Sequence, residues 1–138
     1  MKHFLILLLT SLSITGIGLA QEKQHKIVFE MVSGDTAVHS AIVRQLNNVL
    51  KAAPDAKLEV VFHGNSIYAL VKDRSFIKES ITDLVKNKKV VIAACANSLK
   101  RLNLTADQLV PEAIVVPVAI LEIVKRQEEG WSYIKSGH

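Results

Sequence analysis

Short apolar segments alternate with amphipathic ones along most of this chain, and this alternation limits the folds that it can adopt. Runs of apolar and β-branched residues cover positions 25–32, 57–63, 89–94 and 113–118, and a shorter run covers 131–134. Between them, apolar residues recur at the three- and four-residue spacing of an α-helix. Strands that are apolar on both faces need cover on both sides, so helices must flank a parallel sheet. The pattern predicts a three-layer α/β/α domain.

Turn and capping residues indicate where several of the predicted helices begin and end. The turn Ser33-Gly34-Asp35 precedes the first long helix and is able to cap it. In that helix, His39 falls among the polar residues, opposite a stripe of apolar ones. Thr105 and Gln108 have the spacing of a capping box, and Gly130 is expected to end the last helix.

The first twenty residues have the three parts of a signal peptide. Lys2 supplies the positive charge, positions 4–12 form an apolar run, and small residues lead to Ala20. We expect cleavage after Ala20, which leaves residues 21–138 as a single domain. A transmembrane anchor is the alternative, but the stretch is short for a bilayer span and polar residues interrupt it. The expected mature protein is periplasmic or secreted, with no membrane attachment after cleavage, and a bacterial periplasm fits best.

The charge of the chain argues against nucleic-acid binding. The formal net charge is +4, and removal of the leader, which contains Lys2 and no acidic residue, lowers it to +3. The cations are spread along the sequence, and aromatic residues make up only 5% of it. Proteins that bind nucleic acids instead concentrate Lys and Arg with aromatic residues among them.

The candidate site lies where the strands end, because ligands of open parallel sheets collect beyond the carboxyl ends of the strands. The residues at these ends include one cysteine, one histidine and several small polar side chains. They are Ser33, Gly34, Asp35, His63, Gly64, Asn65, Ser66, Cys95, Asn97, Ser98 and Pro117.

Cys95 is the only cysteine and stands where a strand passes into a short helix. Helix N–H groups there favour the thiolate, and Asn97 and Ser98 could stabilise it further. A lone cysteine after two alanines could equally be an apolar filler of the core. His63, at the end of another strand, could donate a proton in the same cleft or serve a structural purpose.

The sequence predicts neither a metal nor a cofactor. The four histidines after residue 20 stand at positions 25, 39, 63 and 138, without a paired spacing, and a single cysteine cannot supply a zinc site. Gly34 and Gly64 are isolated, so neither a dinucleotide fingerprint nor a P-loop is present. No nucleophile-elbow motif supports a serine hydrolase.

Four segments together resemble the DsrE/DsrF-like family: HKIVFEMVSGD, LEVVFHGNSIYAL, VVIAACANSLKRLNL and PEAIVVPVAILEIVKRQEEGWSYIK. The resemblance spans about residues 26–135 and places the chain in an exported, divergent branch of the sulfur-relay proteins. It implies a Rossmann-like domain with a mostly parallel five-stranded sheet. It also implies oligomers, often trimers or hexamers, and a cysteine that carries sulfane sulfur as a persulfide. Cys95 occupies that cysteine position, and a sulfur donor or acceptor protein would be its partner.

Two functions from different classes remain open at this point. In the first, Cys95 accepts sulfur as a persulfide and passes it to a thiol, with Asn97 and Ser98 stabilising the thiolate and His63 assisting. In the second, an oligomeric, non-catalytic module holds a small ligand between subunits, using Asn65, Ser66 and the same helix terminus. Self-association is expected in both, because the helix after residue 118 carries Ile120, Ile123 and Val124 on a broad apolar face.

Overall fold

A computed structural model describes residues 24–88 and 90–137, and all structural statements below refer to these residues. The predicted signal peptide, and Lys89 at the predicted start of the third strand, lie outside them. Five strands form one sheet: β1 (Lys26–Met31), β2 (Lys57–Phe62), β3 (Val91–Cys95), β4 (Ile114–Val116) and β5 (Ser132–Ser136). The spatial order is β4-β3-β2-β1-β5, and every neighbouring pair is parallel. The predicted α/β class and five-stranded sheet are therefore confirmed.

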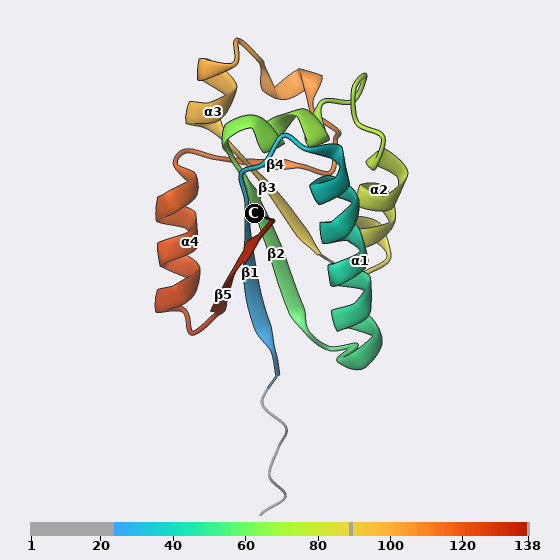
Figure 1. Ribbon diagram of the computed structural model, residues 1–138. Helices are drawn as coiled ribbons and strands as arrows, with labels where there is room; N and C mark the ends of the chain where they lie inside the picture. The colour runs from blue at the N-terminus through green and yellow to red at the C-terminus, as the bar shows by residue number, and fades with distance from the viewer. Residues whose placement is uncertain (1–23, 89, 138) are drawn as a thin grey trace, which may run out of the picture.

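Helices cover both faces of the sheet, but unequally (Figure 1). The helices α1 (Thr36–Ala52), α2 (Lys78–Lys86) and α3 (Ala96–Arg101) contribute to one core cluster, whereas α4 (Ala119–Glu128) packs on the other face. Two short 3₁₀ helices, η1 (Gly64–Leu70) and η2 (Ala106–Gln108), complete the connections. Among the described residues, a single helix thus protects the second face, which we call the α4 face.

The order of the strands explains this distribution of helices. The crossovers from β1 to β4 step across the sheet in one direction, while the crossover through α4 returns past β1 to place β5 at the opposite edge. Right-handed crossovers that run in opposite directions lie on opposite faces of a sheet. The connection after β3 and the connection after β4 therefore leave adjacent strands toward different faces.

Local signals in the sequence fix three helix ends as predicted. Asp35 caps α1 by accepting a hydrogen bond from the Ala37 N–H at 2.8 Å. The capping box at Thr105 is present, and Gly130 ends α4 with a φ of 82°.

One prediction about α1 was wrong. His39 is buried, because it continues the buried stripe of Ile42 and Leu46 at helical spacing. Its Nε2 atom donates a hydrogen bond to the Ser33 carbonyl at 2.8 Å, which satisfies the ring inside the protein.

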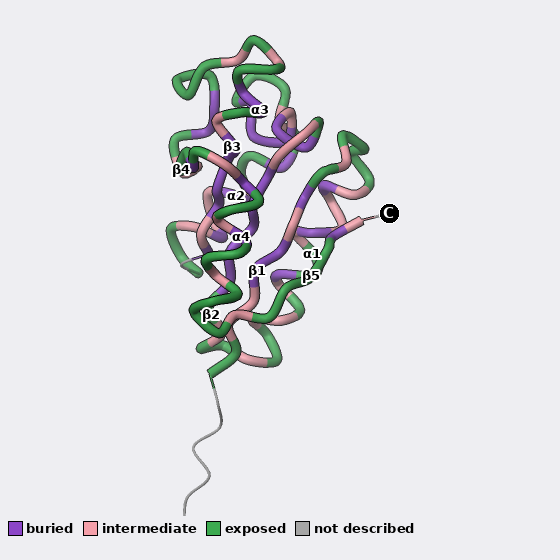
Figure 2. The backbone as a smooth tube through the Cα atoms, turned by 90° about the vertical axis from the view of Figure 1, so that its left-hand side faces the viewer, coloured by how far each residue is buried: buried purple, intermediate pink, exposed green. Residues whose placement is uncertain are grey.

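The two faces of the sheet differ in exposure. The larger core contains Phe29, Leu58, Phe62 and Ile92 together with the apolar sides of α1 and α2. On the α4 face a smaller cluster surrounds Cys95, and four of the five residues of β5 are exposed. Figure 2 views the molecule from this side and shows exposed β5 next to the buried inner strands.

Candidate functional site

Cys95 is the last residue of β3 and the N-cap of α3, as its position in the sequence indicated. It belongs to the cluster on the α4 face, with Ala93, Val116 and Ala119 among its members. Cys95 is only 4% exposed, so its surroundings and not bulk water determine the state of the thiol.

The sulfur lies at the beginning of α4. Ala119 is the first residue of that helix, and its N–H donates a hydrogen bond to Sγ of Cys95 at 3.4 Å. The N–H groups of Asn97 and Ser98 at the start of α3 also act on the sulfur. Donors from two helix N-termini thus converge on one atom, and both favour negative charge there.

Burial and hydrogen bonding act in opposite directions on the thiol. Burial, the largest single influence, opposes ionisation, but it is outweighed by the Ala119 N–H, the N–H and hydroxyl of Ser98, and the Asn97 N–H. Together these donors hold the pKa of Cys95 below its ordinary value. A cysteine that served only as apolar filler would instead have its pKa raised.

The position of Cys95 also agrees with a general property of parallel sheets. The chain leaves β3 toward the face of α1 and leaves β4 toward the α4 face, so the connections diverge between these adjacent strands. Open α/β sheets bind ligands at such a divergence, beyond the carboxyl ends of the strands. The thiol lies at this point.

The structure brings Ser98 and the end of β2 close to Cys95. Ser98 Oγ accepts a hydrogen bond from the Gly64 N–H at 2.9 Å, which ties the loop after β2 to the start of α3. His63 follows β2 directly, and its Nε2 atom lies 2.8 Å from Oε1 of Glu30 on β1. Asn97 is exposed and contributes its backbone N–H to the thiol environment.

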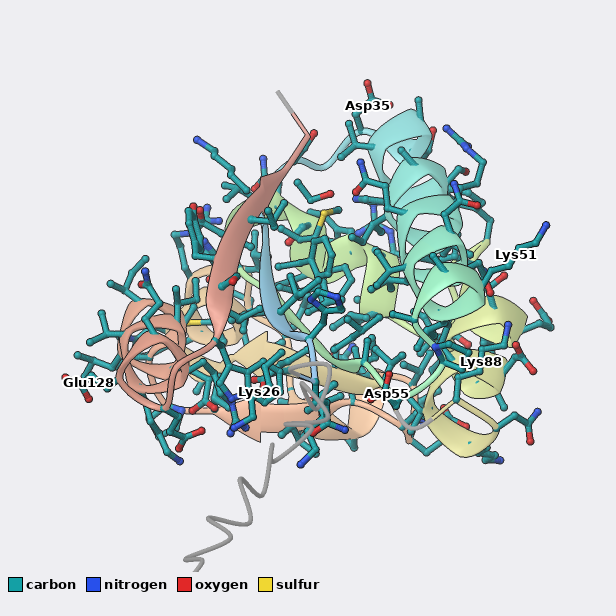
Figure 3. The ribbon with its side chains drawn as sticks, turned by 90° about the horizontal axis from the view of Figure 1, so that it is seen from below. Lys26, Asp35, Lys51, Asp55, Lys88 and Glu128 are labelled. Atoms are coloured by element: carbon teal, nitrogen blue, oxygen red, sulfur yellow. The ribbon has the colours of Figure 1, made fainter. Side chains whose placement is uncertain are left out.

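The other predicted candidates have partners elsewhere. Ser66 is buried, and its hydroxyl donates to the carbonyls of Met31 at 2.6 Å and His63 at 2.8 Å. Asn65 accepts a hydrogen bond from Arg101 at 3.3 Å. Asp35 stands at the start of α1, where it caps the helix (Figure 3).

Two residues near the site were missed by the sequence analysis. Glu30 Oε2 accepts a hydrogen bond from the hydroxyl of Tyr133 on β5, while its other oxygen contacts His63. A carboxylate in the middle of the apolar run KIVFEMV was a usable signal, because such a residue needs partners when its strand is buried. Tyr133 could not have been identified, since 103 positions separate it from Glu30.

The described residues do not contain three His, Cys, Asp or Glu side chains grouped so that they could hold a metal ion. Within the same residues, no helix is both long and apolar enough to cross a lipid bilayer. The site combines a buried thiol with a lowered pKa at the end of β3 and a histidine-carboxylate pair at the ends of β2 and β1.

Comparison with known proteins finds a matching family and a similar solved structure. A model of the DsrE/DsrF-like family matches residues 25–136. No curated protein sequence matches the chain. Among solved structures, MTH1491 from Methanobacterium thermoautotrophicum, described as a protein of unknown function, superimposes with a TM-score of 0.77. The two sequences are 26% identical, and the alignment covers 81% of this chain and 99% of that one.

Proposed function

Because the chain belongs to the DsrE/DsrF-like family, whose membership suggests a sulfur-relay role, we propose that Cys95 carries sulfane sulfur as a persulfide. The observation that carries this proposal is the hydrogen bond from the Ala119 N–H to Sγ of Cys95 at 3.4 Å. It favours the thiolate, which is the form that attacks sulfur. The same N–H can stabilise the anion of the persulfide when its charge lies near Sγ.

The transfer step requires no external oxidant. The Cys95 thiolate attacks the outer sulfur of a donor persulfide R–S–SH, and an S–S bond forms at Sγ. The S–S bond of the donor breaks, and its thiol leaves as R–S⁻. Passing the sulfur on repeats the step with an acceptor thiolate as the nucleophile and Cys95 as the leaving group.

A mass measurement on native protein tests this proposal. Reduced protein is treated with inorganic polysulfide, and the peptide that contains Cys95 is analysed after the free thiols are blocked. We expect a gain of one sulfur atom on this peptide, and no gain in Cys95→Ser. A Cys95 thiol that gains no sulfur, and that reacts with iodoacetamide only after unfolding, would show that this residue fills the core.

The alternative, a non-catalytic ligand-binding module, receives less support from the geometry. Its expected contacts were Asn65 and Ser66, but the Ser66 hydroxyl already donates to two backbone carbonyls inside the protein. Under this alternative, Cys95→Ser would bind small ligands as well as the unmodified protein does. The sulfur-carrier proposal predicts that the same substitution abolishes sulfur loading.

A further inference from the structure

Three hydrogen-bonded side chains span the strands on one side of Cys95. They are His63 after β2, Glu30 on β1 and Tyr133 on β5, which come from three neighbouring strands. Glu30 is the centre of the group: one carboxylate oxygen lies 2.8 Å from Nε2 of His63, and the other accepts from the Tyr133 hydroxyl. The family comparison and the Cys95 geometry assign no role to this group.

The group shares the α4 face with Cys95. Glu30 lies two residues after Val28, and His63 lies two residues after Val61; both valines belong to the cluster that contains Cys95. Tyr133 is the register partner of Val28. Because side chains alternate along extended strands and register partners point to the same side, all three project from the face that carries the thiol.

The register also places His63 next to Cys95. The last paired residues of β2 and β3 are Phe62 and Ala94, and His63 and Cys95 are the residues that directly follow them. Neighbouring strands are about 4.8 Å apart, so the two backbones remain adjacent there. The hydrogen bond from Gly64 to Ser98 at 2.9 Å keeps these two strand ends together.

The hydrogen bond to Glu30 determines which ring nitrogen of His63 carries a proton. Burial disfavours the charge on Glu30, but the hydrogen bonds from Tyr133 and His63 and the charge of Lys135 outweigh it and lower the pKa of this carboxyl. The ionised carboxylate can only accept, so Nε2 of His63 carries the proton that faces Glu30. The remaining nitrogen, Nδ1, is then free of this carboxylate and able to exchange a proton with a substrate.

Packing of the sheet alone does not require this arrangement. The side chains of His63 and Glu30 are 19% and 12% exposed, so the pair lies at a partly open surface next to a buried thiol. A histidine held by a carboxylate through one nitrogen is the arrangement that orients an imidazole and stabilises its charged form in nucleophilic enzymes.

We propose that His63 is the general acid of sulfur transfer at Cys95, and that Glu30 and Tyr133 position it. This inference rests on the proposed persulfide function. When the Cys95 thiolate takes the outer sulfur of R–S–SH, the S–S bond of the donor breaks and R–S⁻ is released. The imidazolium form of His63 gives its Nδ1 proton to R–S⁻, which departs as R–SH. Glu30 stays ionised throughout, and His63 regains a proton from water.

The acidity of the released thiol provides a selective test. General acid catalysis matters for a basic leaving group and not for one that is stable as an anion. The rate of Cys95 persulfidation is therefore measured with two donors, glutathione persulfide and 4-nitrothiophenol persulfide, at one pH near neutrality. The variants are His63→Gln, Glu30→Gln and Tyr133→Phe. The matched control is Tyr68→Phe, which changes the only other tyrosine.

With glutathione persulfide, we expect His63→Gln to slow the reaction by about 100-fold or more, because proton transfer typically contributes this much. Glu30→Gln is expected to act in the same direction, and Tyr133→Phe more weakly, since it acts through Glu30. With 4-nitrothiophenol persulfide, all three variants should react within about threefold of the unmodified protein. This donor also reports directly on whether each variant retains a folded, reactive Cys95.

Each outcome has a defined meaning. Equal rates of the three variants and the unmodified protein with both donors would overturn the role of His63 while leaving the persulfide function intact. Equal slowing with both donors would also overturn it, because it would indicate damage to the thiol site. Failure of unmodified protein to load sulfur from either donor would overturn the persulfide function and this inference with it.

An independent measurement tests the positioning role without any sulfur chemistry. The hydrogen bond to Glu30 is the largest influence on Tyr133, and with burial and the charge of Glu30 it raises the pKa of this tyrosine to about 12. We expect Glu30→Gln to shift the phenolate transition of Tyr133, measured by ultraviolet absorbance, to lower pH. His63→Gln should leave the phenolate transition of Tyr133 at high pH. An unchanged transition in Glu30→Gln would show that Tyr133 does not hold this carboxylate in solution.

Discussion

At the scale of single residues, Ser98 connects the state of the thiol to the structure around it. Its hydroxyl accepts the Gly64 N–H at 2.9 Å and also helps to lower the pKa of Cys95. Removing that hydroxyl therefore affects both the pKa of Cys95 and the stability of the protein.

We predict that Ser98→Ala raises the pKa of Cys95, so that less thiolate is present at neutral pH. The rate of iodoacetamide labelling against pH should shift to higher pH than in the unmodified protein. The lost hydrogen bond from Gly64 should also reduce the free energy of unfolding by about 1 kcal/mol. Ser75→Ala is the control, because the Ser75 hydroxyl is buried without a hydrogen-bond partner among the described residues. A labelling curve that is the same in both variants would contradict the role of Ser98.

The sequence indicates part of this site and omits the rest for a physical reason. The order of strand, cysteine and helix in VVIAACANSLKRL is local, so Cys95 and Ser98 could be placed at a helix start from it. The Ala119 N–H, which donates to the same sulfur, lies 24 positions further along the chain. It comes close to Cys95 only because α4 crosses over the sheet. Contacts of this kind depend on strand order, which the residue pattern did not determine.

At the scale of secondary-structure elements, Asp35 caps α1, as the turn before this helix indicated, and its place in the candidate site stays a prediction. Its side chain accepts a hydrogen bond from the Ala37 N–H at 2.8 Å, and its own N–H donates a hydrogen bond to Ser33 Oγ at 3.1 Å. We predict that Asp35→Ala lowers the free energy of unfolding by about 1 kcal/mol, as is typical for loss of an N-cap. Thermal or urea unfolding measures this, and Asp35→Ser, which can still cap, is the control. Loss of sulfur loading in a folded Asp35→Ala protein would show that this residue also has a role in the candidate site.

Helix α4 is fastened to the sheet by a charged contact. Glu59 on β2 is fully buried, and its Oε2 lies 2.5 Å from Nε of Arg126 on α4. The Arg126 guanidinium also binds Glu129 at 3.0 Å and lies 5.1 Å from the centre of the Trp131 ring. Burial raises the pKa of Glu59, and the charge of Arg126 opposes this effect.

We predict that Arg126→Met destabilises the protein by about 3 kcal/mol or more, because it leaves a buried carboxylate without its partner. The loss in the free energy of unfolding should be largest near neutral pH. It should shrink as the pH falls toward 4.5, the ordinary pKa of a glutamate such as Glu59, because the buried side chain is then protonated and neutral in the folded protein. Adding Glu59→Leu to Arg126→Met should recover most of the stability. Unfolding curves at several pH values measure both effects, and a loss that is independent of pH would contradict this account.

At the scale of the whole molecule, layer architecture could be predicted but the place of each strand could not. Apolar strands that alternate with amphipathic helices require a covered parallel sheet, whichever order the strands adopt. The position of β5 beside β1 sets the position of Tyr133 near Glu30. Within residues 24–88 and 90–137 it also leaves a single helix on one face, with exposed apolar residues at its surface.

Export concerns the part of the chain that precedes the described residues. We predict that the mature protein begins at Gln21 and is found in the periplasmic fraction, because the first twenty residues have the pattern of a cleaved signal peptide. Intact-mass measurement of the protein from fractionated cells tests this directly. A cytoplasmic protein that retains residues 1–20 would contradict it.

Self-association is the last expectation, and it concerns the outer surface of α4. Ile120, Leu121 and Val124 on this helix are exposed in the single chain, whereas Ile123, expected on the same apolar face, is buried against the sheet. Exposed apolar surface of this kind is usually covered by another protein surface. Leu121 is the most exposed of these, at 64%.

We predict an oligomer whose mass, measured by light scattering at micromolar concentration, is a small multiple of that of the mature chain. Leu121→Glu should shift the population toward single chains, because burying a carboxylate without a partner in an apolar interface is costly. Phe76→Glu is the matched control: Phe76 is also an exposed apolar residue, at 51%, but it stacks on His39 of α1, on the opposite side of the sheet. Dissociation by Phe76→Glu but not by Leu121→Glu would move the interface to the α1 side. A mass of one chain for the unmodified protein would show that the α4 surface remains uncovered in solution.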